Sequence, residues 1–258
     1  MCLIAFAWQP DTAIPLIAAS NRDEFYQRPT QTLHNWHDDY GVIAGQDLEA
    51  GGTWLGINQY GRFAALTNIR DPKRMTGEIS RGRLVQGFLQ STTAPERYLQ
   101  ALVDDVERYA GFNLLVGDRH ALYFLNSVEK TVKHLKAGVY GLSNANLDTP
   151  WPKLVRIKEG LANLLPLPSK DQLLTLLHDP WQPADSELPE TGVSVELERM
   201  LSSGFIQSDN YGTRASTALI INTDGRFEVH EKSFGPKGCP LGEVSINGRF
   251  SLAPLPQD

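Results

Sequence analysis

The sequence has little of what marks membrane or nucleic-acid-binding proteins. No apolar run approaches the roughly 18 residues that a membrane-spanning helix needs. No block of basic residues stands out, and the formal charge is −6 with a pI near 5.5, whereas proteins that bind nucleic acid regardless of sequence normally carry a basic face. We therefore expect no transmembrane segment, no nucleic-acid partner, and a small molecule as the substrate or ligand.

Cysteine is also scarce: the chain has only Cys2 and Cys239, and neither stands in a CxxC or another metal-ligand spacing. The pair His34 and His37 lies in HNWHDD, which we interpret as a polar loop and not as a metal site. We expect no metal and no cofactor. Two lone thiols are typical of a reducing compartment, and no basic segment precedes the first apolar run as in a signal peptide. Both features predict a cytoplasmic protein.

The remaining composition is that of a globular protein, with 41% hydrophobic and 21% charged residues. We expect one domain over residues 1–258, in which strands joined by hairpins alternate with short groups of helices. Apolar runs and turn residues predict strands at 2–8, 14–20, 53–57, 62–68, 112–118, 120–126, 131–135, 138–144, 214–222 and 226–232. Helical spacing predicts helices at 81–90, 95–110, 150–165 and 170–179. This order predicts an α+β fold with antiparallel sheet and helices outside.

Cys2 is the first candidate for chemistry. Methionine aminopeptidase removes Met1 when a small residue follows, which would leave a free α-amine on the residue that carries the thiol. The amine titrates near 7.7–8.0 and a free thiol near 8.5, so one residue would offer a nucleophile and a base of matched acidity. The alternative is that Cys2 is a small buried apolar residue at the start of a strand.

The second predicted strand ends in Asn21, Arg22, Asp23 and Glu24, and a hairpin would return this polar end to the start of the first strand. An arginine near a thiol favours the thiolate, and a carboxylate near an α-amine orients it. Neighbours on a strand point to opposite faces, so Asn21 would share the face of Asp23 and not that of Arg22. The alternative is a hydrogen-bonded corner in which Arg22 and Asp23 only pair with each other and the backbone.

Three more residues are candidates for substrate binding. Trp54 follows the glycine turn of GGTWLG, which lacks the lysine and hydroxyl residue of a phosphate loop, and is a core or pocket-wall aromatic. Asn68 and Arg70 follow a strand and could line the same pocket, although an asparagine-stabilised turn is the alternative. The segment 180–190, PWQPADSELPE, is interpreted as a surface loop more than as a cover for substrate.

Several motifs resemble those of one family when they are taken together and in order. They are MCLI, NRDEFYQRPT, GGTWLGIN, ALTNIRDP, SRGRLV, GLSNANLDTPWPK and YGTRASTALI. The chain resembles the NRDE family, whose eukaryotic members are the transport and Golgi organisation proteins. That family is similar to the N-terminal nucleophile hydrolases of the penicillin V acylase and bile salt hydrolase group, which implies a four-layer αββα sandwich of two antiparallel sheets.

The resemblance also implies roles for residues. Cys2 would be the nucleophile, and Arg22 and Asp23 the pair near its thiol and amine. Asn144 in GLSNAN would help to form the oxyanion hole, and Arg214 in YGTRAST would support the site. The acylases space their arginine and aspartate three apart, whereas Arg22 and Asp23 are adjacent.

Two functions follow. The first is an N-terminal-cysteine amidohydrolase that acts on a small acyl amide, a possible hydrolase of non-peptide C–N bonds. The second is a non-catalytic binding or trafficking protein for haem or for acyl-CoA and related lipid, as the eukaryotic relatives suggest.

Overall fold

The structure is a computed structural model, which describes residues 2–70 and 76–251, and it contains two antiparallel sheets. The six-stranded sheet has the order β10 (Gly138–Leu142), β1 (Cys2–Trp8), β2 (Leu16–Phe25), β11 (Tyr211–Ile221), β12 (Arg226–Phe234) and β13 (Pro240–Arg249). The seven-stranded sheet has the order β3 (Thr30–Asn35), β4 (Ile43–Asp47), β5 (Leu55–Ile57), β6 (Phe63–Asn68), β7 (Phe112–Gly117), β8 (Leu122–Asn126) and β9 (Thr131–His134).

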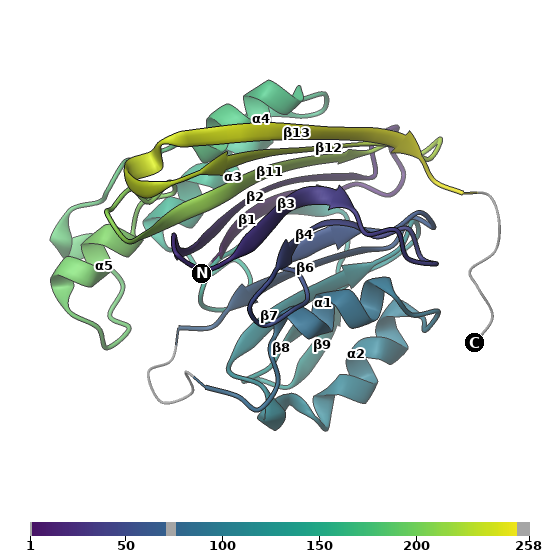
Figure 1. Ribbon diagram of the computed structural model, residues 1–258, viewed down its shortest axis with the longest axis horizontal. Helices are drawn as coiled ribbons and strands as arrows, with labels where there is room; N and C mark the ends of the chain where they lie inside the picture. The colour runs from purple at the N-terminus through teal and green to yellow at the C-terminus, as the bar shows by residue number, and fades with distance from the viewer. Residues whose placement is uncertain (1, 71–75, 252–258) are drawn as a thin grey trace.

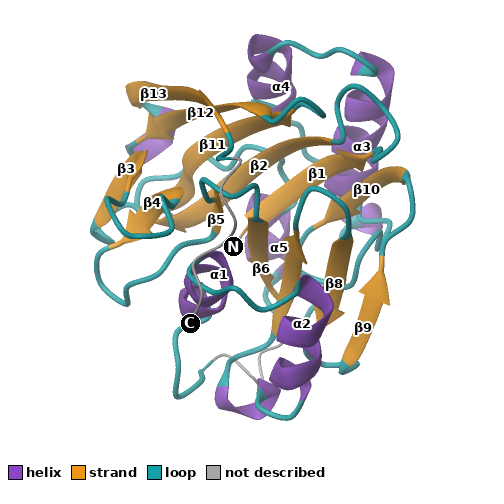
Figure 2. Ribbon diagram, turned by 90° about the vertical axis from the view of Figure 1, so that its right-hand side faces the viewer, coloured by secondary structure: helices purple, strands orange, loops and turns teal. Residues whose placement is uncertain are grey.

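The sheets lie face to face with helices on their outer sides (Figure 1). The helices are α1 (Gly82–Leu89), α2 (Pro95–Val103), α3 (Pro152–Leu164), α4 (Lys170–Leu177) and α5 (Val195–Leu201). Helices α3 and α4 cover the six-stranded sheet, and α1 and α2 cover the seven-stranded sheet (Figure 2). This is the predicted αββα arrangement. No helix in the described ranges is long and apolar enough to cross a membrane.

Strand β1 is buried along its whole length because both of its faces are covered. Ile4, Phe6 and Trp8 point into the apolar layer between the sheets, whereas Leu3 and Ala5 pack against the helix layer. This is why the sequence shows a continuous apolar run here and no alternation with polar residues. The predicted hairpin is confirmed: β1 pairs with β2, and Cys2 lies opposite Arg22.

Two sequence predictions are wrong in their extent. The strands in 112–144 do not form one meander, because β10 leaves the sheet of β7 to β9 and pairs with β1. The helix predicted over 95–110 ends at Val103. Asp104 and Asp105 follow there, and negative charge at the carboxyl end of a helix opposes its dipole; a short 3-10 turn at Val106–Arg108 takes over.

The sequence also left elements unpredicted. Strand β3 buries only Leu33, and every residue of β13 except two is exposed, so neither shows the alternation that marks a strand. His34 therefore lies in a strand and not in a loop, while Cys239 precedes β13 as an exposed thiol. The segment 180–190 is mostly exposed, as expected for a surface loop.

Candidate active site

A cavity of about 150 Å3 lies between the layers at the start of β1. Several predicted site residues line it, namely Cys2, Arg22, Asp23, Trp54 and Asn68. The other lining residues come from the ends of neighbouring strands, from the loops between them and from the start of α1: Glu24, Arg28, Asp47, Thr53, Leu66, Ser80, Arg81 and Gly82. Asn21, Arg70, Asn144 and Arg214 are not in this lining. The topology thus brings together residues from both sheets and from the segment that enters α1.

The Cys2 thiol is free and only 7% exposed, among the apolar side chains between the sheets. Burial raises its pKa above the ordinary value, while the nearby charge of Arg22 acts to lower it. Arg22 lies directly opposite Cys2 in the β1–β2 pair, and opposed residues share a face of a sheet. The thiol is therefore predominantly protonated at neutral pH and needs a base before it can act as a nucleophile.

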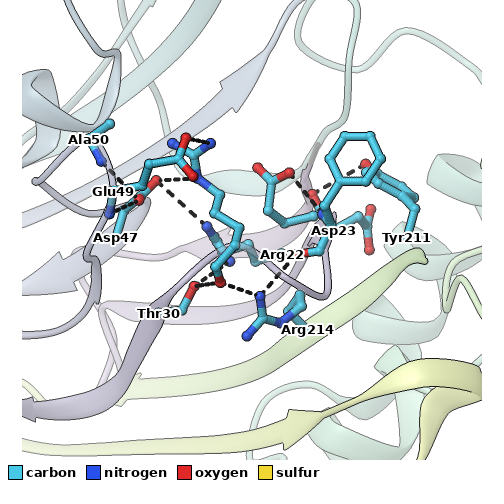
Figure 3. A network of polar contacts seen from close by, with 11 residues as sticks. Arg22, Asp23, Thr30, Asp47, Glu49, Ala50, Tyr211 and Arg214 are labelled. Carbon is cyan, nitrogen blue, oxygen red and sulfur yellow. Dashed lines mark hydrogen bonds and ion pairs between the residues drawn. The ribbon is translucent and has the colours of Figure 1, made fainter.

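Arg22 crosses from one sheet to the other. Its guanidinium lies 4.4 Å from the centre of the Trp54 ring, and Nη2 is 3.8 Å from Oδ2 of Asp47. Nη1 donates to Oγ1 of Thr30 at 3.4 Å. Figure 3 shows Arg22 with Thr30 and Asp47, and Asp23 beside Tyr211. One interpretation of the sequence paired Arg22 with Asp23. In the structure Arg22 contacts Trp54, Asp47 and Thr30 instead.

Asp23 has the opposite orientation, which it shares with Asn21 as the strand alternation predicted. Its carboxylate accepts a hydrogen bond from Oγ1 of Thr213 at 2.8 Å, and its backbone carbonyl accepts one from the hydroxyl of Tyr211. Burial raises the pKa of Asp23, because the charged form loses water, and the charges of Lys153 and Arg22 act to lower it. The protonation state of Asp23 therefore depends on the positive charges near it.

Asn21 has its polar atoms satisfied away from the cavity. Its Nδ2 donates to the carbonyls of Leu177 and Gly204, both at 2.8 Å, and Oδ1 accepts from Oγ of Ser216. These bonds tie β2 to the end of α4 and to the segment before β11. The predicted role of Asn21 in substrate binding stays a prediction, and the contacts shown are structural.

Asn144 and Asn68 form a connected pair. Asn144 follows β10 and is 1% exposed, and its Nδ2 donates to the backbone carbonyl of Asn68 at 2.8 Å. The carbonyl of Asn144 in turn accepts from the backbone N–H of Arg70. Asn144 thus fixes the end of β6, where Asn68 reaches the cavity wall.

The two predicted arginines outside the cavity are held by other partners. Nη1 of Arg70 lies 2.6 Å from Oε2 of Glu198 in α5, with both side chains buried. Nη1 of Arg214 donates to the backbone carbonyls of Phe25 and Arg28, at 3.0 and 2.7 Å. Arg214 therefore braces the turn between β2 and β3 that carries part of the cavity wall.

Sequence reasoning missed Arg28, Asp47 and Arg81. Nε of Arg28 lies 2.9 Å from Oδ2 of Asp47. The same carboxylate oxygen lies near Arg22, so Asp47 forms ion pairs with two guanidinium groups. Arg81 precedes α1 and donates to the carbonyl of Gly111 at 3.2 Å. Burial lowers the pKa of Arg81, while Cys2 and Glu24 act to raise it. The available signal was weak: Asp47 precedes the glycine turn in AGQDLEAGGTW, and Arg81 opens the helix predicted at 81–90.

In the parts of the chain that the structure describes, no group of three or more histidine, cysteine or acidic side chains could hold a metal ion. Of the predicted histidine pair, His34 has Nδ1 2.8 Å from the carbonyl of Thr32. The cavity around Cys2 thus offers thiol, guanidinium, carboxylate and amide groups.

The fold matches that of known hydrolases. The conjugated bile acid hydrolase of Clostridium perfringens, solved as a mutant, superposes with a TM-score of 0.55 at 8% identity over 96% of this chain and 92% of that one. A second variant of the same enzyme gives a TM-score of 0.51 at 9% identity over 98% of both chains. The chain therefore has the two-sheet fold of these conjugated bile acid hydrolases.

The sequence defines the family more closely. The profile of the family described as Transport and Golgi organisation 2 matches residues 1–236. The Bos taurus homologue of Transport and Golgi organization protein 2 is 35% identical over 90% of this chain and 93% of its own length. The Homo sapiens homologue is 34% identical over 92% and 94%. The chain belongs to the Transport and Golgi organisation 2 family.

Proposed function

We propose that this protein is an N-terminal-cysteine amidohydrolase, with Cys2 as the nucleophile after removal of Met1 and a small acyl amide as substrate. One observation carries the proposal: the Cys2 thiol lines a cavity together with Arg22 and Asp23, which come from the paired strand. The fold shared with conjugated bile acid hydrolases adds support. The protein would act in the cytoplasm, where both cysteines stay reduced.

In the proposed reaction the neutral α-amine of Cys2 takes the thiol proton, and the sulfur forms a bond to the amide carbonyl carbon. The tetrahedral intermediate collapses as the amine gives that proton to the leaving nitrogen, so the C–N bond breaks and a thioester remains. Water, activated by the same amine, then attacks the thioester carbonyl. The acyl group leaves as a carboxylate, and the thiol is restored.

The neighbouring residues have separate tasks in this scheme. Arg22 favours the thiolate by its charge. The pair Asn68 and Asn144 stabilises the developing oxyanion, with Asn68 at the cavity wall and Asn144 fixing its backbone. Asp23 orients the α-amine, and Arg214 holds the turn that carries Arg28.

A second function is supported by the arginines of the cavity. Arg22, Arg28 and Arg81 line it together, and guanidinium groups suit carboxylates and phosphates. Haem and acyl-CoA carry such groups, so a non-catalytic binding or trafficking role is the alternative. It needs neither the Cys2 thiol nor removal of Met1.

The first experiment determines the intact mass of the purified protein and then its activity on a panel of N-acyl amides. We expect the mass without Met1, a burst of amine release, and a trapped acyl group on Cys2. Cys2→Ala should lose activity by at least about 1000-fold, as expected for loss of a nucleophile. Cys239→Ser removes the other, exposed thiol and should keep full activity.

Retention of Met1, or equal activity of Cys2→Ala and the wild type, would overturn the hydrolase. Titration with haem and with an acyl-CoA tests the alternative on the same proteins. Saturable binding that survives Cys2→Ala but weakens in Arg81→Leu, without turnover of any amide, would favour the binding protein.

A further inference from the structure

A second cavity, of about 300 Å3, lies beside the cavity that contains Cys2. Apart from Trp54, its lining comes from β3 in one sheet and from β11, β12 and β13 in the other. Trp54 lines both cavities, and Thr30 of the second accepts a hydrogen bond at 3.4 Å from Nη1 of Arg22 in the first (Figure 3). The two cavities are therefore neighbours that share one wall.

One row of paired residues crosses the six-stranded sheet from Cys2 into the second cavity. Each residue of the row lies opposite the next: Cys2, Arg22, Ala215, Ser233 and Gly242. Opposed residues share a face of a sheet, and the face of Cys2 and Ala215 is the one between the two sheets. Because neighbouring strands are about 4.8 Å apart, Ser233 lies about 14 Å from Cys2 along this row.

Beyond Arg22 the row carries only small side chains, and these form the floor of the second cavity. Ala215, Ser233 and Gly242 all belong to its lining, and an added Cβ on Gly242 would meet no atom within 4 Å. Larger apolar side chains complete the walls, namely Trp54, Phe234, Leu241 and Val244. The row thus leads from the candidate nucleophile into a space with largely apolar walls.

The buried polar side chains of this lining already have partners in the protein. Arg214 donates to the backbone carbonyls of Phe25 and Arg28. Glu231 accepts a hydrogen bond from the backbone N–H of Leu33 at 2.8 Å. An apolar group placed in the cavity would therefore not take these side chains from their partners.

The Cys2 cavity alone is small for a substrate. Its volume of about 150 Å3 is below the roughly 300–1,000 Å3 of small-molecule pockets. Its lining carries several charged side chains, among them Arg22, Asp23 and Arg81, which suit a polar leaving group better than an apolar chain. The second cavity supplies the apolar space that the first lacks.

We propose that the second cavity binds the acyl chain of the substrate. At roughly 30 Å3 for each methylene-sized group, its volume suits an unbranched chain of about eight to ten carbons. The chain extends from the carbonyl carbon at Cys2 along the Trp54 ring and over Ala215. The inference rests on the proposed function, because it names the substrate class of the same site: amides of medium-chain acyl groups.

The test measures acylation of Cys2 by p-nitrophenyl esters with chains of two to twelve carbons, below the concentrations at which they form micelles. The thiol sulfur bonds to the carbonyl carbon, the C–O bond breaks, p-nitrophenolate leaves, and the thiol proton passes to solvent. Intact mass of the protein in a Cys239→Ser background gives the rate, which is divided by the rate of the same ester with free cysteine. We expect this relative rate to rise by up to about fourfold for each methylene, as for burial of one methylene, until the cavity is full.

A second series carries the chain on the leaving group, as S-alkyl thioacetates. The sulfur of Cys2 again bonds to the carbonyl carbon, the bond to the alkyl sulfur breaks, and the alkyl thiolate leaves and takes up the thiol proton. We expect little dependence on chain length in this series. A rise with chain length here, and none with the esters, would show that the second cavity binds the leaving group, and it would overturn the assignment to the acyl chain.

Val244→Phe tests the cavity itself, because Val244 is a half-buried residue of its lining. The larger ring should displace two or more methylenes and lower the ratio of the decanoyl to the butyryl rate by at least about tenfold. Ile246→Phe is the matched control: Ile246 lies two residues further on the same face of β13 and packs against the same apolar cluster, but it is outside the lining. It should keep the wild-type ratio. If Val244→Phe does not fold, Ala215→Leu fills the cavity closer to Cys2 and should lower the ratio further.

The outcomes separate this inference from the proposed function. Hydrolysis of amides without a preference for longer acyl chains, or with equal ratios in Val244→Phe and the wild type, overturns the acyl cavity and leaves the hydrolase. Failure of every ester to acylate Cys2 also overturns the acyl cavity. A preference for longer chains that Val244→Phe removes, without turnover of any amide, supports the cavity and counts against the hydrolase. Retention of Met1 overturns the hydrolase, and the ester ratios still decide the cavity.

Discussion

Glu231 is a single side chain that should make stability depend on pH. It lies in β12, is 3% exposed, and accepts a hydrogen bond from the backbone N–H of Leu33 at 2.8 Å. Burial raises its pKa to about 7, against the opposing effect of the Leu33 N–H and of Arg22. An unfolded glutamate titrates near 4.3. Between these values the folded protein holds a proton that the unfolded chain has lost, so stability falls as pH rises.

We compare the free energy of unfolding of the wild type with that of Glu231→Gln. The wild type should lose roughly 3 kcal/mol relative to the variant between pH 4 and pH 8, because the pKa of Glu231 is higher in the folded protein than in the unfolded chain. Urea unfolding of both proteins at several pH values measures it. Glu243→Gln, an exposed residue of β13, is the control and should show no such trend. A difference that is constant with pH would show that the pKa of Glu231 is not raised by folding.

At the scale of elements, helix α5 depends on one buried ion pair. The helix has seven residues, too few to be stable by propensity, and Glu198 ties it to Arg70 after β6 with side chains 5% and 6% exposed. Removing one partner leaves a buried charge, so Arg70→Met should cost about 3–5 kcal/mol. Urea unfolding measures the loss, and the double variant Arg70→Met, Glu198→Met should recover part of it.

The control is Arg199→Met in the same helix, where Arg199 pairs with Asp185 at the surface. Exposed pairs contribute little, so its unfolding curve should match that of the wild type. A cost for Arg70→Met no larger than that for Arg199→Met would mean that water reaches the buried pair.

The elements that sequence could predict are those whose signal is local. The β1–β2 and β11–β12 hairpins follow from apolar runs around short turns, and α4 begins at a capping box of Ser169 and Gln172, which is also a local sequence pattern. Strand β13 was missed because only Val244 and Ile246 of its residues are partly buried, and α5 was missed because its partner is over a hundred residues away in the chain. No local sequence pattern indicates that β13 pairs with β12 or that α5 contacts Arg70.

At the scale of the whole molecule, Trp54 joins the two layers. An added Cβ on Gly45 of β4 would lie 2.3 Å from the Trp54 ring, and the Arg22 guanidinium of β2 covers the ring from the opposite sheet. Trp54→Ala should cost about 3–5 kcal/mol, the usual loss for a buried aromatic. It should also speed iodoacetamide labelling of Cys2 in a Cys239→Ser background.

Urea unfolding and intact mass measure these two effects. Trp181→Ala removes a tryptophan that is 38% exposed and should change neither the unfolding curve much nor the labelling rate. Equal labelling of Cys2 in both variants would show that Trp54 does not restrict access to the cavity.

The part of the site that one hairpin holds was the most predictable from sequence, although Trp54 and Asn68 from the other sheet also line the cavity. Cys2, Arg22 and Asp23 meet through a hairpin that the sequence predicts, whereas Asp47 and Arg81 reach the cavity from the other sheet and its helix layer. The sequence suggested residues after β6 for the pocket, but it could not show that Asn68 lines the cavity while Arg70 turns to α5. Which side chain turns inward depends on packing between layers.

The strand order sets a sequence of events during synthesis. Strand β1 lies between β10 and β2, and β2 pairs with β11, which begins at Tyr211. Strand β1 therefore lacks its neighbour β10 until more than half of the chain has been synthesised, and β2 lacks its neighbour β11 for longer still. Contacts of such long sequence separation form late. During that interval the strand of Cys2 lacks the neighbours that bury it in the folded protein, so the removal of Met1 on which the proposed function depends would take place before the sheet is complete.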